Sequence, residues 1–330
     1  MILQPAVLAL LVADALTALL VAGAAWFALG VVRRWDIASG SERQIALERR
    51  TYLVSTLLAY TFGFQLVGLF LFVHTADALA GSLVGAMCAA GTLNANAWGY
   101  PALGLKIATF VLAGVWLVVN AADNRAEDYP LVRAKYLFLL ALAPLILAEA
   151  ALQAAFLLSL RPDVITSCCG TLFSDGKGTL ASGLAALPIG PMRVAFFASL
   201  AAAVAAGALF LTRRRGVALF AALSGLAFAV GAASLVSFIG IYAYELPTHR
   251  CPFCVLQREY GYIGYALYGA LLGGAVLGLG AGAIAPAAGI PSLATVVPRL
   301  QRRLIAVSCA LWTLLAVTVA WTIIATDFRP

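Results

Sequence analysis

Residues Thr51–His74 read TYLVSTLLAYTFGFQLVGLFLFVH, a run of 24 positions without an acidic residue, a lysine or an arginine. A helix needs about 20 apolar residues to cross the hydrocarbon core of a bilayer, so this stretch predicts a transmembrane helix. The whole chain agrees, because 63% of its 330 residues are hydrophobic and only 11% are charged. A water-soluble domain carries roughly 25% charged residues. The sequence therefore predicts an all-α integral membrane protein without a soluble domain.

Seven further stretches are long and apolar enough to span a bilayer, which predicts a bundle of about eight transmembrane helices. The predicted spans are residues 4–32, 51–74, 99–121, 136–160, 191–211, 217–244, 255–283 and 304–326. We divide the chain accordingly into three parts. These are an N-terminal four-helix half with the Cys88 loop (1–160), a Cys-Cys loop (161–190) and a C-terminal four-helix half with the CPFC motif (191–330).

Along the chain, predicted loops that are rich in lysine and arginine alternate with loops that are poor in them. Loops 33–50, 122–135, 212–216 and 284–303 hold 14 of the 21 lysine and arginine residues. Because such loops stay on the cytoplasmic side, we expect both termini to be extracytoplasmic in a multi-pass protein of a bacterial-type cytoplasmic (inner) membrane. Cationic loops facing anionic lipid also account for the net charge of +7, so we expect membrane lipid and no nucleic acid as a partner.

Five of the six cysteines fall in loops on the predicted extracytoplasmic side, and only Cys309 lies inside a span. The five are Cys88, Cys168, Cys169, Cys251 and Cys254. Thiols persist as disulfides in oxidising compartments, so thiol chemistry is expected on that face.

The stretch THRCPFCVLQREYGYIGYALY, residues 248–268, places a Cys-x-x-Cys pair ahead of an apolar run. If Cys254 begins span seven, the free N–H groups and dipole of the helix favour its thiolate. A continuous helix would then put Arg258, Tyr262 and Tyr265 on the face of Cys254, where Arg258 could stabilise a thiolate and a reduced quinone head group. The alternative is an inert structural disulfide beside an interfacial arginine.

This motif resembles the quinone-reducing motif of the DsbB-type (DsbB/VKOR-like) disulfide-bond-forming thiol–quinone oxidoreductases, in which Cys-x-x-Cys precedes a helix that opens with a Gln-Arg pair. The resemblance covers about twenty residues. It implies Cys251 and Cys254 as the quinone-linked pair, Arg258 as its electrostatic partner and Gln257 as a further match. That family has four helices and a second cysteine pair after the motif, whereas here the remaining outer cysteines precede it.

The adjacent pair Cys168–Cys169 lies in a loop with several glycines. It is a candidate for exchange with Cys88 or with the CPFC pair, and an ordinary cross-loop disulfide is the alternative. A soft metal ion is a third possibility, with Cys168, Cys169, Cys251, Cys254 and His249 as ligands.

Asp14, Lys106 and Glu149 lie well inside the first, third and fourth predicted spans. Charges within a membrane are candidates for function. Because quinone reduction consumes protons, they form a possible proton relay, with Gln153 one turn from Glu149. A structural interhelical pair between Asp14 and Lys106 is the alternative.

The sequence thus predicts a membrane thiol–disulfide oxidoreductase. It would pass electrons between extracytoplasmic thiols, for example those of a thioredoxin-like protein, and a membrane quinone such as ubiquinone or menaquinone. Two other classes stay open: a protein that binds copper or mercury through its outer cysteines, and a disulfide-stapled structural subunit of a membrane complex.

Overall fold

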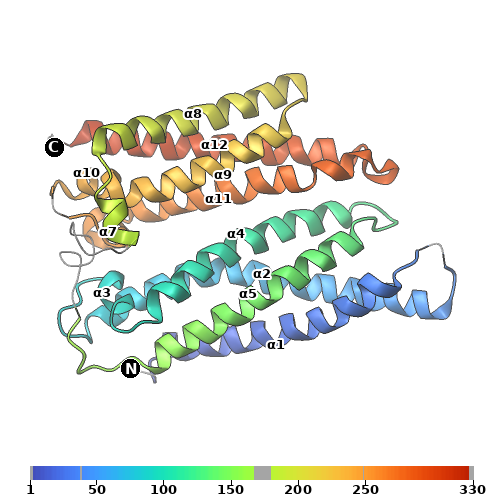
Figure 1. The fold of residues 1–330 in the computed structure, drawn as a ribbon, viewed down its shortest axis with the longest axis horizontal. Coiled ribbons are helices and arrows are strands. Elements are labelled where there is room, and N and C mark those ends of the chain that lie inside the picture. The colour runs from blue at the N-terminus through green and yellow to red at the C-terminus, as the bar shows by residue number, and fades with distance from the viewer. Residues whose placement is uncertain (1–2, 38, 167–179, 248, 327–330) are drawn as a thin grey trace. The chain divides into compact units, whose positions relative to one another are not determined.

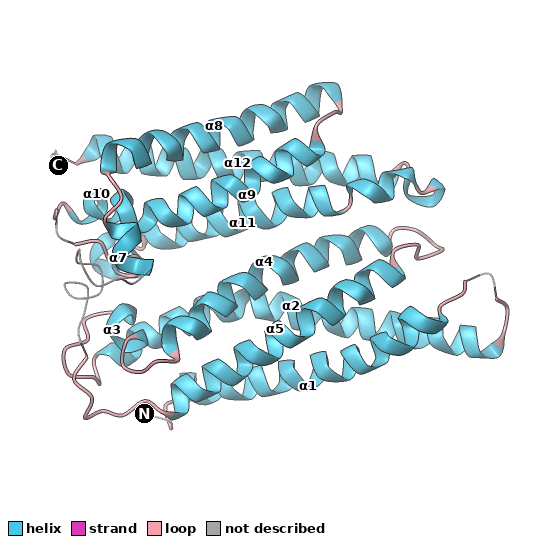
Figure 2. Ribbon diagram, viewed as in Figure 1, coloured by secondary structure: helices cyan, strands magenta, loops and turns pink. Residues whose placement is uncertain are grey.

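The computed structural model describes residues 3–37, 39–166, 180–247 and 249–326 (Figure 1). It confirms the predicted fold class, because eight of its helices are long and apolar enough to cross a membrane. They are α1 (Pro5–Arg34), α2 (Glu42–Ala80), α4 (Gly99–Asp123), α5 (Val132–Leu158), α8 (Ile189–Arg213), α9 (Val217–Ser234) with its continuation, α11 (Ile263–Ala283) and α12 (Val296–Ala325). Figure 2 shows these helices joined by loops, with no strand in the described parts of the chain.

The described parts of the chain also contain three short α-helices: α3 (Ala89–Leu93), α7 (Leu180–Ala185) and α10 (Gly240–Tyr244). A π-helical segment, Leu235–Ile239, connects α9 to α10, so that the sixth span runs from Val217 to Tyr244. Such segments insert one extra residue into a helix and are frequent near functional sites.

Several helices extend beyond their apolar runs. The second begins at Glu42, nine residues before the predicted span, and α12 begins at Val296. With 39 residues, α2 is about 58 Å long at 1.5 Å per residue, longer than the full thickness of a bilayer. Its charged first turns must therefore project into water, where hydropathy carries no signal of helix.

The chain forms two compact units. Unit 1 comprises Met1–Thr75, Asn96–Arg161 and Ala283–Gln301, and it contains the α1, α4 and α5 helices with most of α2. These four helices form a bundle (Figure 1). Its core includes the ring of Phe62, which meets Trp116 edge-on with centroids 4.9 Å apart.

Unit 2 comprises Ala76–Ala95, Pro162–Gly282 and Arg302–Pro330. Helices α8, α9, α11 and most of α12 form its bundle (Figure 1), around a core that includes Phe196, Phe238 and Trp312. The two units do not coincide with the N-terminal and C-terminal halves into which the sequence was divided, and one difference concerns function. The Cys88 segment belongs to unit 2, together with the CPFC motif.

Candidate thiol centre

The sequence pattern predicted that the CPFC segment continues directly into a transmembrane helix. The structure shows that it does not. Residues Cys254–Leu256 and Arg258–Tyr260 form two single 3₁₀ turns, separated by Gln257 in an extended conformation. Gly261 and Tyr262 then adopt left-handed conformations, with φ of 63° and 56°. Two successive left-handed residues cannot belong to an α-helix, so α11 begins only at Ile263.

The prediction of one shared helical face is therefore wrong for Cys254, Arg258, Tyr262 and Tyr265. Cys254 is buried, whereas Arg258 is exposed on its short turn. The rings of Tyr262 and Tyr265 lie 6.2 Å apart and are 52% and 39% exposed. Arg258 and Tyr262 thus lie on the exposed chain between the buried thiols and α11, and Tyr265 lies at the exposed start of α11.

Two tyrosines that the sequence pattern did not indicate, the buried Tyr244 and the half-buried Tyr268, hold the CPFC turn. The hydroxyl of Tyr244 donates to the carbonyl of Cys251 and accepts the N–H of Val255 at 2.9 Å. From α11, the hydroxyl of Tyr268 donates to the carbonyl of Pro252 at 2.5 Å. Both tyrosines lie in apolar runs where rings usually serve packing, so the sequence carried no signal of this role.

Gly264 lets the first turn of α11 approach the turn that carries Cys254. A β-carbon at Gly264 would lie 2.8 Å from Val255 Cγ2 and 2.9 Å from the Val255 carbonyl carbon. Side chains essentially never pack that closely, so only glycine fits this contact.

Cys88 reaches the same place from the other segment of unit 2. It precedes the buried helix α3, and its sulfur lies 3.5 Å from the sulfur of Cys251, at hydrogen-bond distance. The sulfur of Cys254 completes a group of three in which all sulfurs lie within 4.8 Å of one another. All three cysteines are buried. We call this group the thiol centre.

Asp77 and Gln257 join the two segments that carry the thiol centre. Asp77 Oδ1 accepts the backbone N–H of Ala89, the first residue of α3, at 3.0 Å. The same oxygen accepts the side-chain amide of Gln257 at 3.0 Å, and that amide also donates to the carbonyl of Met87 at 3.3 Å. Through these hydrogen bonds, Gln257 holds the segment of Cys254 against the segment of Cys88. Asp77 was missed because it is one acidic residue at the end of an apolar run.

The chain that leads toward the Cys-Cys pair is attached to the Cys88 segment. Ile165 and Val84 form an isolated parallel bridge, and Thr166 Oγ1 donates to the carbonyl of Gly91 at 2.7 Å. At Gly85, with φ of 86°, a β-carbon would collide with the Thr166 carbonyl at 2.2 Å. Cys168 and Cys169, two and three positions after Thr166 in the sequence, lie outside the described residues.

His249 lies beside the thiol centre but does not belong to the three-sulfur group. Its ring packs edge-on against Tyr244 with centroids 4.4 Å apart, and its Nε2 is buried without a hydrogen-bond partner among the described residues. Burial lowers the pKa of His249 below its ordinary value, and the nearby Cys88 partly opposes that shift. The imidazole is thus held in its neutral form.

The candidates for a proton relay lie in unit 1. Lys106 Nζ is 2.5 Å from Glu149 Oε1 and 3.9 Å from Asp14 Oδ1. The Asp14–Lys106 contact expected as the structural alternative is thus present, with Glu149 as the closer partner of the lysine.

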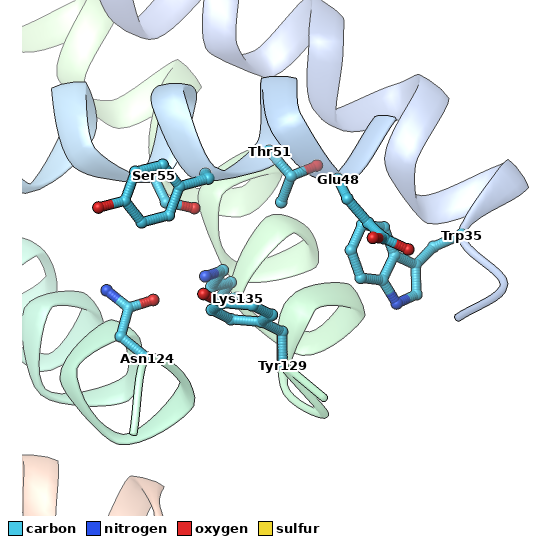
Figure 3. Close-up of a pocket in the computed structure, with 8 residues that line it drawn as sticks. Trp35, Glu48, Thr51, Ser55, Asn124, Tyr129 and Lys135 are labelled. Atoms are coloured by element: carbon cyan, nitrogen blue, oxygen red, sulfur yellow. The ribbon is translucent and has the colours of Figure 1, made fainter. Parts of the chain in front are cut away.

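Unit 1 also contains a pocket, shown in Figure 3. It is lined by Trp35, Glu48, Thr51, Tyr52, Ser55, Asn124, Tyr129 and Lys135. The lysine is committed to a buried ion pair, because its Nζ lies 2.6 Å from Asp123 Oδ2. None of the residues that the sequence selected as functional lines this pocket.

The fold and its eight apolar helices define a multi-pass membrane protein. In comparisons with protein-family models, with curated proteins and with solved structures, the chain has no match in any of the three. Its function must therefore be inferred from the chemistry of its own residues.

Proposed function

We propose that this protein is a membrane thiol–disulfide oxidoreductase whose thiol centre passes electrons from a thiol substrate to a membrane quinone. The observation that supports this most is the approach of Cys88 Sγ to within 3.5 Å of Cys251 Sγ, next to the Cys254 sulfur. Thiol–disulfide exchange requires an attacking thiolate close to a disulfide sulfur. Three mutually close sulfurs allow a disulfide to move between them.

The proposed cycle starts from a Cys251–Cys254 disulfide. The Cys88 thiolate attacks Cys251 Sγ, which forms a Cys88–Cys251 disulfide and releases the Cys254 thiolate. A substrate thiolate then attacks Cys88 Sγ and releases the Cys251 thiolate. A second substrate thiolate attacks the mixed disulfide, so that the substrate disulfide leaves and the Cys88 thiolate returns.

The Cys251 and Cys254 thiolates then reform their disulfide and give up two electrons. The acceptor, a quinone of ubiquinone or menaquinone type, takes these electrons and the two protons released by the substrate thiols. The balance is two thiols and one quinone converted to one disulfide and one quinol. The same geometry serves the reverse reaction, and reduction potentials decide the direction.

The residues for the acceptor follow from the resemblance to the DsbB-type motif and from exposure. Arg258, Tyr262 and Tyr265 are exposed and follow Cys254 within eleven positions of the sequence, and they would offer a cation and two aromatic rings to a quinone head group. Gln257 fits such a contact poorly, because its amide already donates to Asp77 and Met87. We assign Gln257 a positioning role.

We infer from the alternation of arginine and lysine that both termini and the thiol centre are extracytoplasmic, in a bacterial-type inner membrane. A thioredoxin-like or other thiol protein would then be the substrate. A pair of introduced cysteines tests this. In a variant without native cysteines, Ser82→Cys should react with a membrane-impermeant maleimide in intact cells, and Ala294→Cys only after lysis. The opposite result would reverse the topology.

A soft metal ion is the second candidate, favoured by the same three sulfurs. Sulfurs that share a zinc ion at 2.3 Å lie about 3.8 Å apart. The sulfurs of Cys88 and Cys251, 3.5 Å apart, are near that spacing, and all three sulfurs lie within 4.8 Å of one another. Cys88, Cys251 and Cys254 would be the ligands, and Cys168 and Cys169 of the predicted set lie outside the described residues.

One experiment separates the two candidates. Protein in lipid nanodiscs is mixed without oxygen with a dithiol and a soluble quinone, and quinol formation is followed by absorbance. The oxidoreductase should form quinol catalytically, Cys254→Ser and Cys88→Ser should lose this activity, and Arg258→Ala should weaken quinone use. Cys309→Ser, which removes the cysteine of α12, is the matched control and should keep full activity.

Quinol formation that is unchanged in Cys254→Ser would rule out the proposed cycle. Metal analysis of the reduced protein belongs to the same experiment. A stoichiometric bound metal, lost in Cys88→Ser and accompanied by no quinol formation in the native protein, would establish the metal-binding alternative.

A further inference from the structure

A polar centre lies between the helices of unit 1, at Asp14 on α1, Lys106 on α4 and Glu149 on α5. Glu149 is well satisfied. Its Oε1 accepts Lys106 Nζ at 2.5 Å, and its Oε2 accepts the hydroxyl of Thr109 at 2.5 Å and the side-chain amide of Gln65 on α2. Three donors, one of them charged, stabilise the carboxylate form of Glu149.

Asp14 has no comparable partners. Its Oδ1 lies 3.9 Å from Lys106 Nζ, too far for a hydrogen bond, and its Oδ2 is buried without a hydrogen-bond partner in the described chain. Asp14 is nevertheless largely buried, with 12% of its side chain exposed. A carboxylate in such a place gives up hydration without receiving hydrogen bonds in return.

The charges do not balance either. One lysine faces two carboxyl groups, so the fully ionised centre would carry a net charge of −1 among apolar helices. The charged groups that act on Asp14 are Lys106 and Glu149, and α2 contributes the neutral Gln65. A buried, uncompensated charge is costly, and the cost is removed when one carboxyl group binds a proton.

The side chain of Gln153 also indicates that the polar centre can take up a small polar species such as water. Gln153 lies one turn from Glu149 on α5 and is fully buried, yet neither its amide nitrogen nor its oxygen has a partner among the described residues. Buried amides of this kind are usually satisfied by water. Water beside the polar centre would let protons reach it.

We propose that the polar centre of unit 1 is a proton-binding site, in which Asp14 gains and loses the proton while Glu149 and Lys106 remain an ion pair. A membrane protein with such a site can respond to the proton concentration on one side of the bilayer. This inference does not depend on the thiol centre, which belongs to unit 2.

Infrared spectroscopy of the protein in nanodiscs tests the proposal, because a protonated carboxyl group has a C=O stretching band that a carboxylate lacks. At neutral pH the native protein should show this band and Asp14→Asn should lose it. In Glu149→Gln the lysine is left with Asp14 alone, so the band should vanish at neutral pH and return on acidification. In Lys106→Met both carboxyl groups should be protonated and the band should grow.

Asp128→Asn, at an exposed position of unit 1, is the matched control and should leave the band unchanged. A band that survives Asp14→Asn would place the proton elsewhere and overturn the assignment. A native protein without the band would overturn it too. If replacing sodium by choline then made the band appear, a monovalent metal ion would be the ligand in place of the proton.

Discussion

The side-chain amide of Gln257 donates a hydrogen bond to Asp77 Oδ1 at 3.0 Å, across 180 positions of the sequence. Because the same oxygen accepts the first N–H of α3, one carboxylate orders both the segment of Cys88 and the segment of Cys254. The distance between the thiols thus depends on a contact that contains no sulfur.

Asp77→Ala should therefore loosen the thiol centre. Hydrogen bonds to charged groups contribute about 1.5–3 kcal/mol, and partial exposure places this one at the lower end. In a Cys254→Ser background, mild oxidation should link Cys88 to Cys251 efficiently, and Asp77→Ala should slow this linkage. Asp77→Asn keeps an acceptor oxygen and should behave nearly like the parent. Equal linkage rates in all three proteins would contradict the proposed role of Asp77.

Removing the hydroxyl of Tyr268 should destabilise the CPFC turn. Tyr268→Phe leaves the half-buried carbonyl of Pro252 without its 2.5 Å donor, which costs about 0.5–1.5 kcal/mol. Thermal unfolding of unit 2 should shift downward, and Cys254 should react faster with an alkylating reagent. Tyr265→Phe, at an exposed ring on the same helix, is the control and should change neither quantity.

Gly264→Ala should displace the turn that carries Cys254. The new methyl group would lie 2.8–2.9 Å from Val255 and Leu256, and overpacking of this kind typically costs about 1–3 kcal/mol. We expect a lower unfolding temperature and slower quinol formation. Gly269→Ala on the same helix meets nothing within 4 Å and should be neutral or slightly stabilising. Identical behaviour of the two variants would argue against the close contact at Gly264.

The stability of unit 2 should fall in mild acid because of His249. Burial lowers the pKa of His249 in the folded protein below its ordinary value of 6.5. Below about pH 6.5 the unfolded chain binds a proton that the folded chain does not, so the free energy of unfolding decreases as the pH falls. The loss levels off once the pH is below the folded pKa.

Thermal unfolding between about pH 8 and pH 5 measures this effect. His249→Gln should show a smaller decrease in unfolding temperature than the native protein over that range. His74→Gln removes an exposed histidine of α2 and should leave the native pH dependence in place. A decrease of the same size in His249→Gln would mean that other groups cause it.

Much of the architecture could be predicted from the sequence. Each apolar run, such as Thr51–His74, forms a helix because a backbone in lipid can satisfy its polar groups only within itself. The ends of α2 and α12 could not be predicted, since helix that projects into water carries no excess of apolar residues. The helical register between Cys254 and Tyr265 was wrong, because local hydropathy does not reveal the left-handed residues Gly261 and Tyr262.

The sequence by itself determined the class of protein and the motif that carries Cys251 and Cys254, because hydropathy and spacing are local properties of the chain. Only the tertiary structure decided which thiol meets that pair. Cys88 approaches Cys251 from 163 positions away, and Asp77, Tyr244 and Tyr268 hold the two segments in place. Contacts of this kind depend on hydrogen bonds between residues far apart in the sequence. A single aspartate or tyrosine in an apolar run does not indicate which residue it will bind.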